Sequence, residues 1–88
     1  MKISGILIED RIKEKILYKH NVHAFEIKEI LFDNPYILKI RDSRYMAIGK
    51  NDKFLTIIFE VENRLAFILT AYPSSDAQRK LFKSKRKL

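Results

Sequence analysis

The spacing of the apolar residues changes once along this chain, at Asp33-Asn34-Pro35. Before this point apolar side chains recur at intervals of three and four residues, which predicts amphipathic helices over about 9–20 and 23–32. After it they alternate, which predicts strands over the segments 36–41, 44–48, 54–62 and 64–72. Pro disfavours a helical conformation in the residue before it, so the sequence marks a clear boundary between the two kinds of element.

This order of elements predicts the α+β class. Two helices followed by a meander of strands favour an antiparallel sheet, because alternating βαβ units are absent. We expect the helices to cover one face of a sheet of three to four antiparallel strands and to leave the other face partly open. The apolar segment 3–8 can add a short first strand, and Ser74 or Ser75 is the expected cap of a final basic helix. We expect residues 1–88 to form a single domain.

The positive charge of the chain is concentrated at its end. The formal net charge is +7, from 18 basic and 11 acidic residues, and no acid follows Asp76. The expected basic tail, about 79–88, contains Arg79, Lys80, Lys83, Lys85, Arg86 and Lys87. We expect its helix to turn Ala77, Leu81 and Phe82 inward. A basic end on a nearly neutral body is typical of a protein that binds a polyanion, most often nucleic acid, although a solvated tail is the alternative.

The composition argues against several other classes of protein. The chain has no Cys, so it has no disulfide framework, thiol nucleophile or thiolate metal site. It lacks a phosphate-binding Gly loop, an HExxH motif and a GxSxG motif. His20 and His23 are three residues apart, but Asn21-Val22 interrupts the helix between them, so we expect no metal and no cofactor. No apolar run approaches the roughly 18–20 residues that span a bilayer, and we expect a cytoplasmic protein without membrane contact.

The alternation along the last two strands predicts which side chains reach the open face. On the first of these strands one face is apolar throughout and is the expected core side: Leu55, Ile57, Phe59 and Val61. Glu60 lies on the other face. With a strict period of two, Thr70 and Tyr72 share a face with Ala66 and Ile68. The short hairpin between the strands then places Glu60 near Thr70.

A ribonuclease without a metal needs only a few groups. A base takes the proton from the ribose 2′-hydroxyl, which attacks the adjacent phosphate, while cations stabilise the phosphate and an acid protonates the leaving oxygen. Glu60 is the candidate base. The candidate phosphate ligands are Arg44, Lys50, Arg79 and Lys80, and Tyr45 or Tyr72 can stack on a base or donate a proton. The alternative for these residues is structural, with Glu60 paired to a cation on a neighbouring strand.

Several short motifs follow one another in an order typical of a known family. They are Lys19-His20-Asn21-Val22, the segment 25–35 with its Asp-Asn-Pro ending, Arg44-Tyr45 followed by Ile48-Gly49-Lys50, the strand 55–59, and Ile68-Leu69-Thr70-Ala71 before a basic helix. Together they resemble the BrnT-type toxins of bacterial and archaeal type II toxin–antitoxin systems, a branch of the RelE-like ribonucleases. The family usually has Arg after the Ser/Thr-Ala pair, where this chain has Tyr72.

The resemblance implies a RelE-like fold, cleavage of messenger RNA that inhibits translation, and a small antitoxin that forms a hetero-oligomer with the toxin. We therefore expect a metal-independent endoribonuclease with RNA as its substrate. The candidate catalytic residues are Arg44, Glu60, Tyr72 and Arg79, and the candidate RNA-binding residues are Lys50, Lys80, Lys83 and Arg86. Two other functions stay open: a non-catalytic RNA- or DNA-binding module, and a protein whose sheet edge or apolar face binds a partner.

Overall fold

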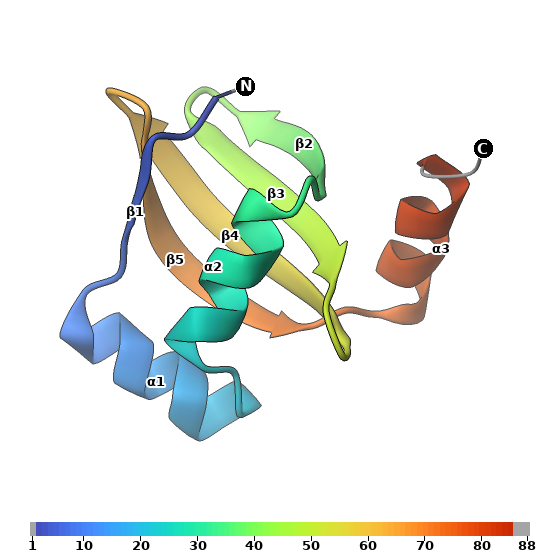
Figure 1. The fold of residues 1–88 in the computed structure, drawn as a ribbon, viewed down its shortest axis with the longest axis horizontal. Coiled ribbons are helices and arrows are strands. Elements are labelled where there is room, and N and C mark those ends of the chain that lie inside the picture. Colours follow the sequence, from blue (N-terminus) through green and yellow to red (C-terminus); the bar gives the residue numbers. More distant parts are fainter. Residues whose placement is uncertain (1, 86–88) are drawn as a thin grey trace.

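The computed structural model describes residues 2–85, which form three helices and one five-stranded sheet (Figure 1). In chain order the elements are β1 (Gly5–Leu7), α1 (Asp10–His20), α2 (Ala24–Phe32), β2 (Tyr36–Arg41), β3 (Arg44–Lys50), β4 (Phe54–Glu62), β5 (Leu65–Pro73) and α3 (Asp76–Lys85). The predicted α+β class is confirmed. β3 runs two residues further than the predicted segment 44–48, through Gly49 and Lys50.

The sheet is larger than predicted and is mixed. Its strands lie in the order β1-β5-β4-β3-β2. The strands from β2 to β5 form the expected antiparallel meander, but β1 pairs in parallel with the beginning of β5, where Ile6 lies opposite Ala66. The expected antiparallel sheet is therefore confirmed for four strands but lacks the fifth, because the segment 3–8 pairs in parallel with backbone groups of β5 that the meander leaves unpaired.

Local sequence explains where several elements end. α1 stops at Asn21, which has a left-handed backbone with a φ of 55°. α2 starts after His23, whose backbone N–H donates to the Glu26 carboxylate at 2.9 Å. The hairpin between β4 and β5 turns through Asn63 and Arg64, with φ values of 53° and 65°. Two positive φ values in succession are what a type I′ turn requires, so this hairpin is tight.

The core lies between α2 and one face of the sheet. The predicted core face of β4 is confirmed, since Leu55, Ile57 and Phe59 are fully buried. Figure 1 shows α2 in front of the sheet and α1 beside β5, beyond the end of β1. α1 packs mainly against β5 and contributes the buried Ile16 to the core. Only α2 therefore lies across the sheet face as predicted, whereas α1 lies along its side.

A β-bulge in β5 changes the faces predicted for the second half of this strand. The register has Phe59 opposite Ile68, Ile58 opposite Thr70 and Thr56 opposite Tyr72. Leu69 is therefore an extra residue, and the period of two is broken there. Ala66 and Ile68 belong to the buried core, whereas Thr70 and Tyr72 lie on the other face. The prediction that these four residues share a face is wrong for this reason.

The face of the sheet opposite the core is only partly covered. We call it the open face and define it by Arg44, Met46, Ile58, Glu60, Phe67, Thr70 and Tyr72, which the strand register places on one side. α3 packs over one end of this face through Gln78 and Phe82. Ala77, which was expected to face inward, is exposed, and α3 has no fully buried residue. α3 is thus attached by few contacts.

Candidate functional site

β3 and β4 place Arg44 opposite Glu60 on the open face. The Arg44 Nε and Nη2 atoms donate to one oxygen of the Glu60 carboxylate at 3.2 and 2.8 Å. The side chains are 34% and 41% exposed, so both remain accessible to a ligand. A carboxylate beside a guanidinium can accept a proton from a hydroxyl while the guanidinium holds an adjacent anion. The same contact also fits the alternative expected from the sequence, in which Glu60 only forms an ion pair with a cation on a neighbouring strand.

Phe67 is a further candidate residue, in addition to those expected from the sequence. It lies opposite Glu60 on β5 and its side chain is 37% exposed. An exposed aromatic ring next to a base and a cation can stack on a nucleobase. The signal available in the sequence was the alternation along this strand, which places Phe67 on the face opposite Ala66 and Ile68.

A second polar cluster surrounds Tyr72. The Gln78 Nε2 atom donates to the Tyr72 hydroxyl at 3.2 Å, and the Gln78 Oε1 atom accepts a hydrogen bond from the Thr56 hydroxyl at 2.9 Å. The ring of His20 lies 6.0 Å from the ring of Tyr72, measured between centroids, at a tilt of 53°. Tyr72 is therefore in contact with α1 through His20 and with α3 through Gln78. The sequence did not indicate that His20 and Gln78 make these contacts.

The structure does not bring Tyr72 and Glu60 together. Tyr72 lies opposite Thr56, which is four residues before Glu60 on β4. At about 3.4 Å per residue, Tyr72 is roughly 14 Å along the sheet from the Arg44–Glu60 pair. The candidate catalytic residues are therefore divided between two places, and a phosphate held by Arg44 is out of reach of the Tyr72 hydroxyl.

The candidate residues of α3, together with Lys50, form a third group near Phe54, at the beginning of β4. Arg79 makes an ion pair with Asp76. The Nζ atoms of Lys50 and Lys83 lie 5.1 and 5.5 Å from the centroid of the Phe54 ring, which is a cation–π arrangement. Lys80 is exposed and lines a shallow hollow with Phe54, Asp76, Arg79 and Lys83. Arg86, the remaining candidate, lies outside the described residues.

Metal ligands and membrane-spanning helices are two further features that bear on function. Within 2–85, no group of three or more His, Cys, Asp or Glu side chains is placed so that it could hold a metal ion. His20 faces Tyr72, whereas the ring of His23 stacks on Phe25 at 5.5 Å between centroids. Among the helices described, none combines the length and the apolar character needed to cross a membrane.

The same fold occurs in a ribonuclease toxin of known structure. The 1.1 Å crystal structure of the Brucella abortus ribonuclease toxin, BrnT, matches with a TM-score of 0.67 and 17% sequence identity. The match covers 82% of this chain and 97% of that chain. No protein-family profile and no curated protein sequence matches the chain. The predicted resemblance to the BrnT-type toxins is thereby confirmed at the level of the fold.

Proposed function

We propose that this protein is the toxin of a type II toxin–antitoxin system and cuts messenger RNA in the cytoplasm without a metal ion. One observation carries the proposal: Glu60 and Arg44 are in contact and accessible on the open face of a fold shared with a ribonuclease toxin. The sequence motifs, which resemble the BrnT-type toxins along most of the chain, support the same function.

In the proposed reaction, the Glu60 carboxylate takes the proton from a ribose 2′-hydroxyl. The 2′-oxygen then attacks the adjacent phosphorus, and the bond from phosphorus to the 5′-oxygen of the next nucleotide breaks. Arg44 stabilises the negative charge that develops on the phosphate oxygens, a water molecule protonates the leaving 5′-oxygen, and Glu60 releases the proton that it has taken to solvent. The reaction leaves a cyclic phosphate on one product, and its base and its cation are two side chains that are already in contact.

Tyr72 and Arg79, two of the candidate catalytic residues, bind RNA in this proposal and take no part in the reaction. Because Tyr72 is roughly 14 Å along the sheet from Glu60, it stacks on a neighbouring nucleotide instead of protonating the leaving oxygen. Arg79, Lys50, Lys80 and Lys83 bind phosphates further along the same strand of RNA.

The test is cleavage of single-stranded RNA by purified protein in the presence of EDTA. We expect Glu60→Gln to lower the cleavage rate about 10²- to 10⁴-fold, because the base is removed while the shape of the side chain is kept. Arg44→Gln should have a comparable effect. The pair is partly exposed, so either change should alter the free energy of unfolding by no more than about 1 kcal/mol.

Glu62→Gln is the matched control, since Glu62 is an exposed carboxylate on the same strand. It should leave cleavage near the level of the unmodified protein. Cleavage that persists in both Glu60→Gln and Arg44→Gln would reject this catalytic pair. Loss of cleavage in EDTA would reject metal independence.

The proposed antitoxin partner is tested in cells. Induced expression of the toxin should arrest growth and reduce messenger RNA, and co-expression of a small protein encoded beside it should restore growth. Growth arrest that no neighbouring gene relieves would argue against a toxin–antitoxin pair.

A non-catalytic RNA-binding protein is the second candidate function. The exposed Phe67 ring and the lysines over the Phe54 ring favour it, because aromatic and cationic groups bind single strands without chemistry. Salt-sensitive RNA binding without any cleavage would select this function over the first.

A further inference from the structure

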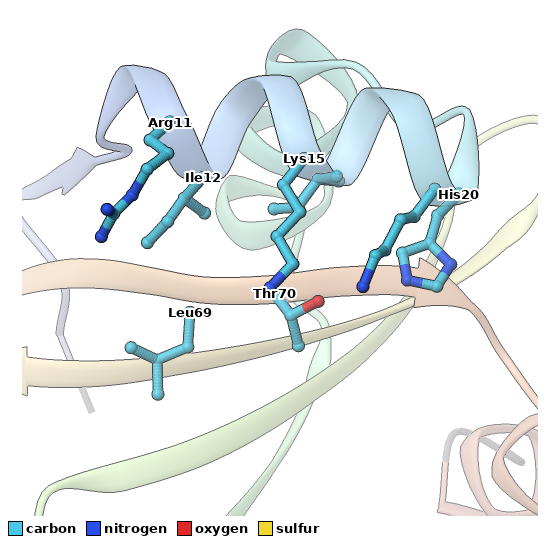
Figure 2. Close-up of a pocket in the computed structure, with 8 residues that line it drawn as sticks. Arg11, Ile12, Lys15, His20, Leu69 and Thr70 are labelled. Carbon is cyan, nitrogen blue, oxygen red and sulfur yellow. The ribbon is translucent and has the colours of Figure 1, made fainter.

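A groove runs between α1 and the second half of β5, with a volume of about 610 Å³. We call it the α1 groove and define it by Arg11, Lys15, Lys19, His20, Leu69 and Thr70, which line it. Figure 2 shows the side chains of Arg11, Lys15 and His20 directed from α1 toward β5. The groove exists because β1 pairs only with the beginning of β5, so the remainder of this strand faces α1 instead of another strand.

The helix side of the α1 groove is strongly basic. Arg11, Lys15 and Lys19 recur every four residues and are exposed, so their charges lie about 6 Å apart along the axis of α1. Within residues 2–85, none of these three side chains forms an ion pair with a carboxylate, and no acidic residue lines the groove. Neighbouring like charges on a helix repel each other, and a bound polyanion would remove this repulsion.

The α1 groove is continuous with the open face. Thr70 lines the groove and also lies opposite Ile58 on the open face. His20, which also lines the groove, contacts the ring of Tyr72. An RNA strand matches this arrangement, because its phosphates repeat regularly and its bases stack on aromatic rings. An acidic peptide offers carboxylates but no base to stack on Tyr72.

We propose that the α1 groove binds the sugar–phosphate backbone of single-stranded RNA and guides the strand past Tyr72 onto the open face. The choice of RNA as the ligand rests on the proposed function, but the groove itself needs no cleavage. Arg11, Lys15 and Lys19 hold successive phosphates, and Tyr72 stacks on a base where the strand turns onto the sheet. The bulge at Leu69 is essential to this path, because it places Thr70 and Tyr72 on the open face.

The test measures binding of a fluorescein-labelled oligouridylate over a range of salt concentrations, with Glu60→Gln as the background so that the RNA stays intact. The groove variant carries Lys15→Gln and Lys19→Gln together. The control variant carries Lys13→Gln and Lys28→Gln together. All four lysines are exposed helical residues, and both proteins lose the same charge. Thermal unfolding checks that both remain folded.

We expect the groove variant to bind roughly 10-fold or more weakly. Its salt slope should fall by about 1.4, because each of the two phosphates that it no longer neutralises accounts for about 0.7. The control variant should match the background protein. Equal affinities and slopes in the two variants would overturn the proposal. Displacement of the RNA by an equal charge concentration of polyglutamate would overturn it too, since an acidic protein segment would then be the better ligand.

The outcomes separate this inference from the proposed function. If the protein never cleaves RNA but the groove variant loses binding, the ribonuclease function fails and the groove proposal stands. If the protein cleaves RNA and the groove variant binds normally, the function stands and the groove proposal fails. If the unmodified protein binds no RNA, both are overturned.

Discussion

Gly49 shows how closely α2 approaches the sheet. A Cβ atom at this buried position of β3 would lie 2.5 Å from the Ile30 Cγ2 atom of α2. This methyl group is attached directly to the branched Cβ atom and cannot turn away without a change of rotamer. The absence of a side chain at Gly49 therefore allows α2 to lie across the core face, which leaves the opposite face of the sheet available for a ligand.

We predict that Gly49→Ala lowers the free energy of unfolding by about 1–3 kcal/mol, because the added methyl overpacks the contact with Ile30. Urea denaturation measures the change. Gly5→Ala is the control: its Cβ atom would lie 2.9 Å from the Leu65 Cδ2 atom, which is the end of a flexible side chain that can move. Equal losses in the two variants would contradict the argument.

At the scale of elements, α3 depends on Gln78. Its backbone N–H donates to the Ser75 hydroxyl at 3.2 Å, and its side chain accepts from the Ser75 N–H at 2.9 Å, which makes a capping box. The same side chain contacts Thr56 and Tyr72 on the sheet. One residue therefore both starts the helix and attaches it to the open face, and Phe82 adds a ring contact with Phe54.

We predict that Gln78→Ala loosens α3 without unfolding the sheet. Loss of the cap costs about 1 kcal/mol, so amide hydrogens of α3 should exchange about 5- to 10-fold faster in hydrogen-exchange mass spectrometry. Amides of β4 should change little. Ser84→Ala, at an exposed position of the same helix, serves as the control. Faster exchange spread evenly over helix and sheet would show that α3 and the sheet unfold as one unit.

At the scale of the whole molecule, two basic regions meet at Tyr72. The α1 groove reaches it through His20, and α3 reaches it through Gln78. The Arg44–Glu60 pair lies on the same face, roughly 14 Å along the strands. With a formal net charge of +7, this arrangement should attract RNA over long distances and hold it by many weak phosphate contacts.

We predict that the contributions of the two regions to RNA binding add. Lys80→Gln with Lys83→Gln should lower the salt slope by about 1.4, and all four changes, with Lys15→Gln and Lys19→Gln, by about 2.8. Additive slopes mean that one strand contacts both regions at once. Double variants that each leave the salt slope nearly unchanged, while the combined variant loses it, would mean that the regions bind separate strands.

Much of this fold could be predicted from the sequence, because its signals are local. Asn21 and Asn63 accept a left-handed backbone, Pro35 disfavours a helix before it, and the alternation of β4 identifies its core face. These properties depend on residues that are close together in the chain. The class, the order of the elements and the position of Glu60 on the open face follow from them.

The tertiary structure alone decided how the candidate residues are grouped. The contact of Arg44 with Glu60 depends on the register of two strands, and the bulge at Leu69 depends on how β5 pairs with β4. The α1 groove likewise arises from where β1 ends along β5. Such pairings join residues that are distant in the chain, and the free energy of each pairing depends on all the strands around it. A local pattern of residues therefore does not predict them.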